Sequence, residues 1–184
     1  MSGAVRVRAG LEDVPAYKQG RPAVALEGTE SFKISSNENP SPPLPSVVEA
    51  VTAALGKINR YPESAATELT ARLAARYDVA PENIILGAGS VEIVSQLIRA
   101  TSAPGDEVVF AWRSFEAYPL LVRTAGAVPV QVPLNAQHGH DLDAMLAAIT
   151  DRTSLVMVCN PNNPTGTTVG TAELTAFLDA VPSN

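Results

Sequence analysis

Apolar residues between positions 44 and 58 recur at intervals of three and four, the spacing that places them on one face of an α-helix. This pattern predicts an amphipathic helix directly after stretch 39–45, in which four of seven residues are proline. A second helix is predicted from about Thr67 to Tyr77, with Leu69 and Leu73 facing inward. The apolar positions of the first helix are Leu44, Val47, Val48, Val51, Ala54, Leu55 and Ile58.

From Ala80 onward, short apolar runs alternate with segments of helical periodicity. Alternation of this kind predicts the α/β fold class, with a largely parallel sheet and helices on both faces. Such sheets bind ligands beyond the carboxyl ends of their strands, so the residues after each run are candidates for a binding site. The apolar runs are 84–86, 108–111, 128–132 and 155–159, and the helical segments are 91–100, 116–125, 142–149 and 172–180.

The segment before these elements is of a different kind. Residues 1–30 lack sustained periodicity and contain Gly10, Pro15, Gly20 and Pro22, which indicates an extended N-terminal arm. An arm of this kind lies on something else, such as a second subunit. We therefore expect an arm over 1–30, a helical segment over 31–79, and the N-terminal part of an α/β domain over 80–184.

Composition and charge narrow the classes of partner. The 184 residues are 46% hydrophobic and 17% charged, as in a globular protein, and the formal net charge is −6. The 13 basic residues are scattered, which argues against nucleic acid and favours a small-molecule partner. Cys159, His138 and His140 are too few for a metal site, so no metal is predicted. Without a run long enough for a membrane span or a signal peptide, we expect a cytoplasmic protein with no membrane partner.

The first predicted strand ends in the turn Gly87-Ala88-Gly89-Ser90-Val91-Glu92, where a helix begins. A helix N-terminus offers unpaired amides and a positive dipole end, and small residues let a phosphate approach the backbone. Ser90 and the amide of Val91 are therefore candidate phosphate ligands, with a simple helix cap at Ser90 as the alternative. A dinucleotide site is a further alternative, weakened because Glu92 stands where that motif has a small residue.

The second strand is followed by the aromatic segment Trp112-Arg113-Ser114-Phe115-Glu116-Ala117-Tyr118-Pro119. An aromatic ring just after the carboxyl end of a strand, a position called the strand exit below, can stack on a planar heterocycle. Phe115 is the candidate for this role. The alternative interpretation is that these aromatic residues belong to the core.

The most specific string, Val158-Cys159-Asn160-Pro161-Asn162-Asn163-Pro164-Thr165-Gly166, directly follows an apolar strand. Two prolines and a glycine fix the turn, and the carboxamide of Asn163 can donate a hydrogen bond to an oxyanion while its oxygen still accepts. An ordinary Asn/Pro turn is the alternative.

This string resembles the Asn-Pro-x-Asn-Pro-Thr-Gly signature of fold-type I aminotransferases. The segments Ser36-Asn37-Glu38-Asn39-Pro40 and Asn59-Arg60-Tyr61-Pro62, the Gly87 turn and the aromatic segment occur in the same order as in that family. Together they resemble the histidinol-phosphate aminotransferase group, including its actinobacterial aromatic amino acid (phenylalanine) aminotransferases, from about Leu11 to the end of the chain. The resemblance implies the large domain of a transferase that depends on pyridoxal phosphate (PLP).

The resemblance also implies a role for each matched residue of the α/β domain. Ser90 and Val91 would bind the phosphate of PLP, Phe115 would stack on the pyridine ring, and Asn163 would form a hydrogen bond with the phenolic oxygen. The family often has tyrosine where this chain has Phe115, so a hydroxyl contact would be lost while stacking remains.

Three matched residues lie before the α/β domain. Tyr61 would reach the phosphate bound to a neighbouring subunit, which implies a homodimer. Tyr17 would line the partner's substrate pocket, and Asn37 would lie near the substrate. The alternatives are that Tyr61 packs on its own domain and that Tyr17 anchors the arm by burying its ring.

The resemblance places the catalytic residues after the Asn-Pro loop, including the Schiff-base lysine that also transfers the proton. The only lysines of this sequence, Lys18, Lys33 and Lys57, precede the predicted α/β domain. We therefore expect this chain to be a fragment or a prematurely ended reading frame, with no catalytic residue of its own and no transaminase activity alone.

For the full-length parent, the resemblance implies transfer of an amino group between an aromatic amino acid and a 2-oxo acid, in amino-acid biosynthesis. The segment from Trp112 to Pro119 looks closer to the aromatic branch than to the histidinol-phosphate aminotransferases of histidine biosynthesis. An NAD-type nucleotide-binding domain and an inactive binding domain are the alternatives from other classes.

Overall fold

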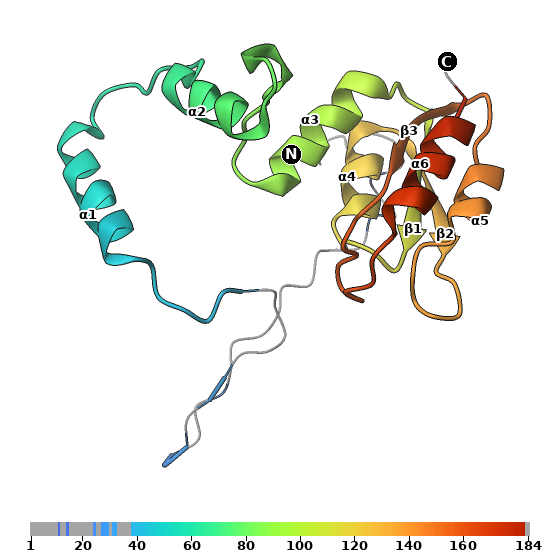
Figure 1. The fold of residues 1–184 in the computed structure, drawn as a ribbon, viewed down its shortest axis with the longest axis horizontal. Helices are drawn as coiled ribbons and strands as arrows, with labels where there is room; N and C mark the ends of the chain where they lie inside the picture. The colour runs from blue at the N-terminus through green and yellow to red at the C-terminus, as the bar shows by residue number, and fades with distance from the viewer. Residues whose placement is uncertain are drawn as a thin grey trace, which may run out of the picture. The chain divides into compact units, whose positions relative to one another are not determined.

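The structure, a computed structural model, describes residues 38–182 together with positions 11, 14, 24, 27–29, 31 and 32. Contacts divide the chain into two compact units, one of Tyr17–Ile85 and one of Leu86–Asn184 together with Met1–Ala16. Figure 1 shows the elements of each unit. No helix in the described part of the chain is long and apolar enough to cross a membrane.

The first unit is helical. It contains α1 (Pro45–Ala54), the short 3-10 helices η1 (Leu55–Lys57) and η2 (Pro81–Asn83), and α2 (Thr67–Tyr77). Pro45 starts α1, where its fixed backbone angle suits a helix and its missing N–H removes no hydrogen bond. Both helices predicted for this region are confirmed, although the apolar side chains of α1, such as Val51 at 57%, are exposed.

The predicted orientation of α2 is wrong at Leu69. The side chain of Leu69 is 51% exposed and Leu73 is half-buried, whereas Ala74 is buried at 4%. The covered side of α2 is set by the chain that follows it, because η2 packs on the helix and the amide of Val79 donates a hydrogen bond to the carbonyl of Ala74 (3.1 Å). Periodicity identifies the helix, but the local return of the chain decides which side is buried.

The second unit is a three-stranded parallel sheet with helices on both faces, which confirms the predicted fold class. The strand order is β2-β1-β3, so β1 is central, and β1 pairs with β2 from Glu107↔Val128 to Trp112↔Pro133. In chain order the elements are α3 (Ser90–Thr101), β1 (Glu107–Trp112), α4 (Tyr118–Ala125), β2 (Val128–Pro133), α5 (Leu142–Ala147), β3 (Thr153–Met157) and α6 (Thr171–Ala180).

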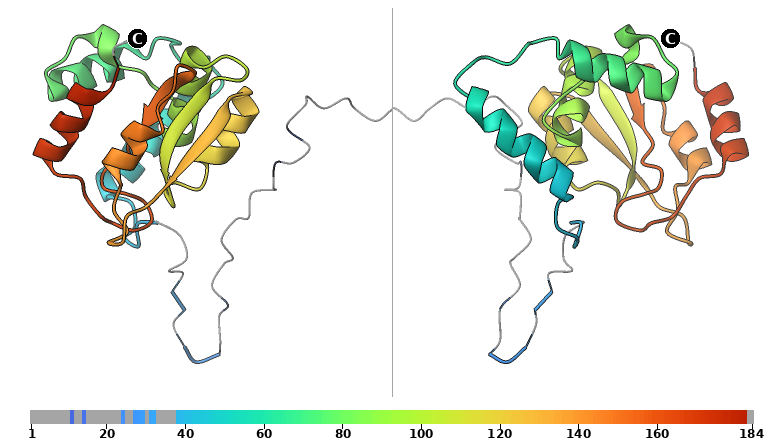
Figure 2. Two further views of the ribbon diagram at one scale, coloured as in Figure 1. Left: turned by 90° about the vertical axis from the view of Figure 1, so that its right-hand side faces the viewer. Right: turned by 60° about the vertical axis from the view of Figure 1, so that its left-hand side comes forward.

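The alternation of side chains along β1 builds two separate cores. Val108 and Phe110 pack with residues of α3 and α4, including Ile98 and Val122. The intervening residues of β1 face the other side and pack with Met145 of α5 and Phe177 of α6. Figure 2 shows the two helix pairs on opposite faces of the sheet. Burying each large apolar side chain contributes roughly 1.5–3 kcal/mol, so this double-sided packing makes β1 the rigid centre of the unit.

The predicted strand 84–86 does not pair with any strand in the described residues. Ile84 has an extended backbone (φ −107°, ψ 124°), but no ladder forms there, because the sheet of the described chain consists of β2, β1 and β3 only. An apolar extended run becomes a strand only when a partner supplies its hydrogen bonds. The other predicted helices and strands are present, with boundaries moved by at most a few residues, and most of the predicted arm 1–30 lies outside the described residues.

Candidate functional site

The loops that follow the three strands lie at one edge of the sheet, because all three strands are parallel (Figure 1). The N-terminus of α3 points toward this edge. Ser102, directly after α3, is hydrogen-bonded through its hydroxyl to Ser154 at the start of β3 (2.7 Å), which places the end of α3 at the opposite edge. Since α3 packs along β3 and spans about 18 Å, its first residues extend toward the strand exits.

The Asn-Pro loop after β3 is closed around Asn162, which is buried at 2% exposure. Its backbone amide donates to the carbonyl of Thr167 (2.8 Å), and its carbonyl accepts from the amide of Gly166 (2.7 Å). Its side-chain amide donates to the hydroxyl of Thr165 (2.8 Å). Gly166 has a φ of 71°, a left-handed conformation in which glycine avoids steric strain. The loop is thus fixed by its own hydrogen bonds.

Asn163, the predicted ligand of the ring oxygen, differs from its neighbour. Its side chain is half-buried, and its carboxamide forms no hydrogen bond with any residue that the structure describes. Asn160 is also occupied, since its side chain exchanges hydrogen bonds with the backbone of Val169 (3.0 Å each). Of the three asparagines in the loop, Asn163 alone has a carboxamide available to a ligand within the described structure.

Ser114 connects the aromatic segment to the Asn-Pro loop, and sequence reasoning missed it. Its hydroxyl donates to the side-chain oxygen of Asn162 (2.8 Å), and the side-chain amide of Asn162 donates to the carbonyl of Arg113 (3.1 Å). Ser114 is 1% exposed, so both partners are shielded from water. Sequence gives little signal for this contact, because the two residues are 48 positions apart. A lone serine among aromatic residues was the only clue.

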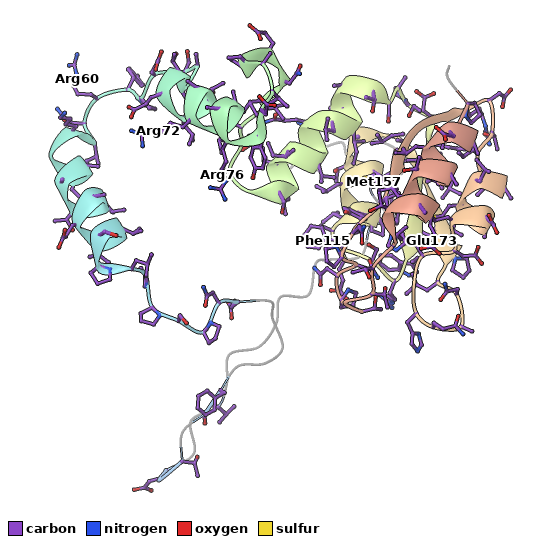
Figure 3. The ribbon with its side chains drawn as sticks, in the orientation of Figure 1. Arg60, Arg72, Arg76, Phe115, Met157 and Glu173 are labelled. Atoms are coloured by element: carbon purple, nitrogen blue, oxygen red, sulfur yellow. The ribbon has the colours of Figure 1, made fainter. Side chains whose placement is uncertain are left out.

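Phe115, the predicted stacking residue, contacts Tyr118 in an edge-to-face arrangement. The ring centroids are 5.5 Å apart with an interplanar angle of 89°, and Tyr118 is in turn edge-on to Phe110 of the core (5.5 Å, 69°). An edge-to-face contact of this kind involves at most one face of the Phe115 ring, so the other face is free of that neighbour. Burial, and then the nearby thiol of Cys159, raises the pKa of Tyr118 to about 12, so its hydroxyl stays neutral. Figure 3 shows Phe115 on the side of the sheet that carries α4.

The start of α3 is open in the way that an anion site requires. The helix has no side-chain cap, and Ser90 and Val91 are exposed. Gly89 precedes them with a φ of 81°, a conformation that favours glycine. Glu92 turns back and accepts a hydrogen bond from the amide of Ala88, so this carboxylate lies on the turn. Candidate phosphate contacts are therefore the hydroxyl of Ser90 and the amides of Ser90 and Val91.

The loop after β2 supports the exit of β3 through His140, which sequence reasoning weighed only as a metal ligand. His140 is 7% exposed, and its Nε2 accepts a hydrogen bond from the amide of Cys159 (3.3 Å). Burial lowers the pKa of this imidazole below its ordinary value and so favours the neutral form, in which the hydrogen bond from Cys159 requires a bare Nε2. The loop itself is closed by Asn135, whose side-chain oxygen accepts from the amides of Gln137 (3.0 Å) and Gly139 (2.9 Å).

A groove of about 530 Å³ lies between α5, α6 and the loop that leads into α5. Its lining includes Asp141, Asp143 and Glu173. Two of these carboxylates cap helices: Asp141 accepts from the amide of Ala144 (2.9 Å), and Glu173 from the amide of Gly170 (2.9 Å). Glu173 is visible on α6 in Figure 3. Asp141 and Glu173 therefore have structural partners, and the groove is separate from the face that carries Phe115.

The remaining predicted site residues lie before the α/β unit. Tyr61 belongs to the helical unit and its side chain is fully exposed, so it does not pack on its own unit. Tyr17 and Asn37 lie outside the described residues. The structure thus brings together the exits that carry Phe115 and Asn163, with the start of α3 directed to the same edge.

Comparison with known proteins agrees with this architecture. The family model for aminotransferase class I and II matches residues 29–184. The chain is 58% identical over 179 residues to the aromatic amino acid aminotransferase of Streptomyces coelicolor and 56% identical over 178 residues to that of Thermobifida fusca. Each alignment covers 97% of this chain, and the chain spans about half the length of the curated relatives it matches (50% and 49%).

A similar fold occurs in a solved structure, the histidinol-phosphate aminotransferase of Sinorhizobium meliloti in complex with pyridoxal-5'-phosphate. The TM-score is 0.83 at 27% sequence identity, and the match covers 98% of this chain and 49% of that chain. The curated relatives and this solved structure therefore carry different substrate names.

Proposed function

Because the chain belongs to the aminotransferase class I and II family, we propose that it forms part of the PLP site of an aminotransferase for aromatic amino acids. The observation that carries the proposal is the half-buried carboxamide of Asn163, unpartnered in the described structure, on a loop otherwise held by hydrogen bonds. A group fixed in this way can bind a ligand without first losing a bond of its own. The names of the relatives that are 58% and 56% identical support the substrate class.

In this proposal PLP supplies an electron sink for moving an amino group from an amino acid to a 2-oxo acid. The residues of this chain bind and orient it. Ser90 and the amides at the start of α3 bind the phosphate, where the positive end of the helix dipole favours an anion. Phe115 presents a ring face to the pyridine, and Asn163 donates a hydrogen bond to the phenolic oxygen.

The described residues fit this cofactor in two respects. The uncapped start of α3 leaves amides for a phosphate, and the edge-to-face contact with Tyr118 leaves at least one face of Phe115 free of that ring for stacking. The carboxylate of Glu92 already accepts from the amide of Ala88 and would repel an anion there, so the amides of Ser90 and Val91 are the proposed phosphate contacts.

Proton transfer requires a group that these residues do not provide. The lysines of the 184 residues are Lys18, Lys33 and Lys57, and Lys57 belongs to the helical unit rather than the α/β unit. We infer that this chain alone binds the cofactor but does not turn over substrate. Purified chain treated with PLP and borohydride tests this inference, since a cofactor-labelled peptide together with measurable transamination would contradict it.

We propose aromatic amino acids rather than histidinol phosphate as substrates. The relatives named for aromatic amino acids are 55–58% identical in the first three comparisons, against 27% for the histidinol-phosphate enzyme. Rates with phenylpyruvate and with histidinol phosphate, measured on the full-length parent, distinguish the two. A strong preference for histidinol phosphate would refute this part of the proposal.

We also propose a homodimer in which Tyr61 reaches the phosphate bound to the neighbouring subunit. The full exposure of its side chain supports a role outside its own unit. Tyr17 and Asn37 are proposed to lie near the substrate. Sedimentation of the chain with and without PLP tests the dimer, and an unchanged monomer at micromolar concentration in both conditions would contradict it.

A comparison of two ligands, pyridoxamine 5'-phosphate and NAD, tests the proposed cofactor. Trp112 is the single tryptophan of the chain and ends β1, next to the candidate site. Pyridoxamine 5'-phosphate keeps the phosphate, the ring and the phenolic oxygen of PLP but forms no covalent bond with lysine, and its ring absorbs where tryptophan emits. We expect it to quench Trp112 with saturation, whereas NAD should not; the reverse result would favour a nucleotide-binding domain.

A further inference from the structure

Two buried polar side chains join the segments that carry the proposed ring ligands. Ser114 and Asn162 are 1% and 2% exposed, and their side chains are hydrogen-bonded at 2.8 Å across 48 positions of sequence. Ser114 directly precedes Phe115, and Asn162 directly precedes Asn163. The buried side chains of Ser114 and Asn162 are thus hydrogen-bonded to each other. The residue after each of them, Phe115 or Asn163, is half-buried.

We propose that the Ser114–Asn162 hydrogen bond is a positioning link that fixes Phe115 and Asn163 relative to each other for cofactor binding. The inference rests on the proposed function. Neither Ser114 nor Asn162 touches the ligand in this scheme; each acts through its neighbour.

The bonds around Asn162 allow one orientation of its carboxamide. Its side-chain amide donates both to the carbonyl of Arg113 (3.1 Å) and to the hydroxyl of Thr165 (2.8 Å), while its oxygen accepts from Ser114. A hydroxyl can accept or donate, so Thr165 and Ser114 would tolerate a flipped amide. The carbonyl of Arg113 only accepts and would face the amide oxygen after a flip. The backbone next to Ser114 therefore fixes the side chain of Asn162.

The link also spans the two exits without a flexible group. On one side it ends in Asn162, whose backbone is closed within its loop by Thr167 and Gly166. On the other it ends in Ser114, one residue from the ring that Tyr118 holds. A shift of either loop must break a buried hydrogen bond, and an unpaired buried polar group is costly. The relative placement of the two ligand groups is therefore set before any ligand arrives.

The chain provides a matched control for this link. Ser154 and Ser102 share a hydroxyl hydrogen bond of 2.7 Å between segments 52 positions apart, at the opposite end of β3 from the Asn-Pro loop. Ser154→Ala removes the same atom as Ser114→Ala, from a comparable cross-chain contact, but far from the strand exits. A general loss of stability should affect both variants, whereas a loss of positioning should affect only one.

The test measures binding of pyridoxamine 5'-phosphate by quenching of Trp112, at a temperature where circular dichroism shows every variant folded. We expect Ser114→Ala to weaken binding about tenfold, as for one lost buried hydrogen bond, and Ser154→Ala to bind as the unaltered chain does. Ser114→Thr, which keeps the hydroxyl, should retain binding. Thr165→Val changes an exposed residue that holds the same carboxamide and should weaken binding in the same direction. Equal affinity of Ser114→Ala and the unaltered chain would overturn the inference.

Hydrogen exchange over residues 160–167 gives a second measurement that needs no ligand. We expect faster exchange of the amides of Asn162 and Gly166 in Ser114→Ala but not in Ser154→Ala. If the unaltered chain does not bind the probe, the proposed cofactor site in this chain is refuted, and exchange then decides the link alone. Unchanged exchange in Ser114→Ala would overturn the link, and faster exchange would support it.

Discussion

The Nε2 atom of His140 accepts a hydrogen bond from the amide of Cys159 across 3.3 Å, which joins the loop after β2 to the exit of β3. Only the imidazole form with a bare Nε2 can accept this bond. Burial lowers the pKa of His140 in the folded protein below the ordinary value of 6.5. The unfolded chain therefore binds a proton at a higher pH than the folded chain does.

The folded protein should therefore lose stability as the pH falls. Below pH 6.5 the unfolded state binds a proton at His140, whereas the folded state, with its lower pKa, remains unprotonated there. The free energy of unfolding therefore falls as the pH decreases. We expect His140→Gln, whose side-chain oxygen can still accept from Cys159, to reduce this fall. Urea unfolding at about pH 7.5 and about pH 5.5 measures it. His138→Asn, at an exposed position in the same loop, is the control and should keep the dependence, whereas an unchanged dependence in His140→Gln would assign it to other groups.

Substitutions of Phe115 test whether its ring stacks on the ring of the cofactor. Phe115→Leu keeps apolar bulk but removes the aromatic face, so we expect the affinity for pyridoxamine 5'-phosphate to fall by about three- to tenfold, the equivalent of roughly 0.5–1.5 kcal/mol. Phe115→Tyr keeps the face and should bind like the unaltered chain. Titration with Trp112 emission as the signal measures both variants. Full affinity in the leucine variant would show that the ring does not stack on the ligand.

Substitutions of the adjacent residues Asn162 and Asn163 should affect stability and cofactor binding differently. Asn163→Ala removes a carboxamide without a partner in the described structure, so the free energy of unfolding should change by less than about 0.5 kcal/mol while cofactor affinity falls. Asn162→Ala leaves the buried hydroxyl of Ser114 unpaired and should destabilise the fold by about 1–3 kcal/mol. Denaturant unfolding and ligand titration of both variants measure the contrast, and similar stability losses in the two would contradict it.

Gly166 should be sensitive to a side chain because of its backbone. With φ at 71°, Gly166→Ala forces a left-handed conformation and should cost about 1–2 kcal/mol, although no heavy atom lies within 4 Å of the added Cβ. Gly56 in η1 also has open space but no left-handed backbone, so Gly56→Ala should be neutral or slightly stabilising. Thermal unfolding of the two variants decides. A loss of similar size in both would mean that backbone strain at Gly166 is not the cause.

Periodicity and turn chemistry were sufficient to predict most of the α/β unit, because these signals are local. Helix α2 matches its predicted bounds, and the alternation of strands and helices predicted the two-faced sheet. Run 84–86 was misjudged because apolar sequence does not say whether a partner strand is present. Leu69 was misjudged because η2, rather than the helix pattern, determines the covered side of α2.

For the candidate site, too, local sequence signals were informative, whereas contacts between distant segments could not be predicted. Asn163 and Phe115 could be proposed from local strings, since each follows a strand within a few residues. Ser114 and Asn162 could not, because their contact depends on two loops meeting in space. His140 was considered for metal binding only; its hydrogen bond with the Cys159 backbone depends on how the loop after β2 meets the segment after β3, two strands that are not neighbours in the sheet. Local sequence thus points to candidate ligand groups, but not to the buried side chains that contact the loops carrying them.

The strand order β2-β1-β3 also has a consequence for how the protein assembles. Strand β1 meets β2 after a single intervening helix, but it meets β3 only after β2 and a further helix have been made, so the second pairing closes the longer loop of chain. We therefore expect β1 and β2 to form the folding nucleus and β3 to dock later. The Asn-Pro loop follows β3, so we expect the hydrogen bond between Asn162 and Ser114 to form in this last step, once all three strands have paired.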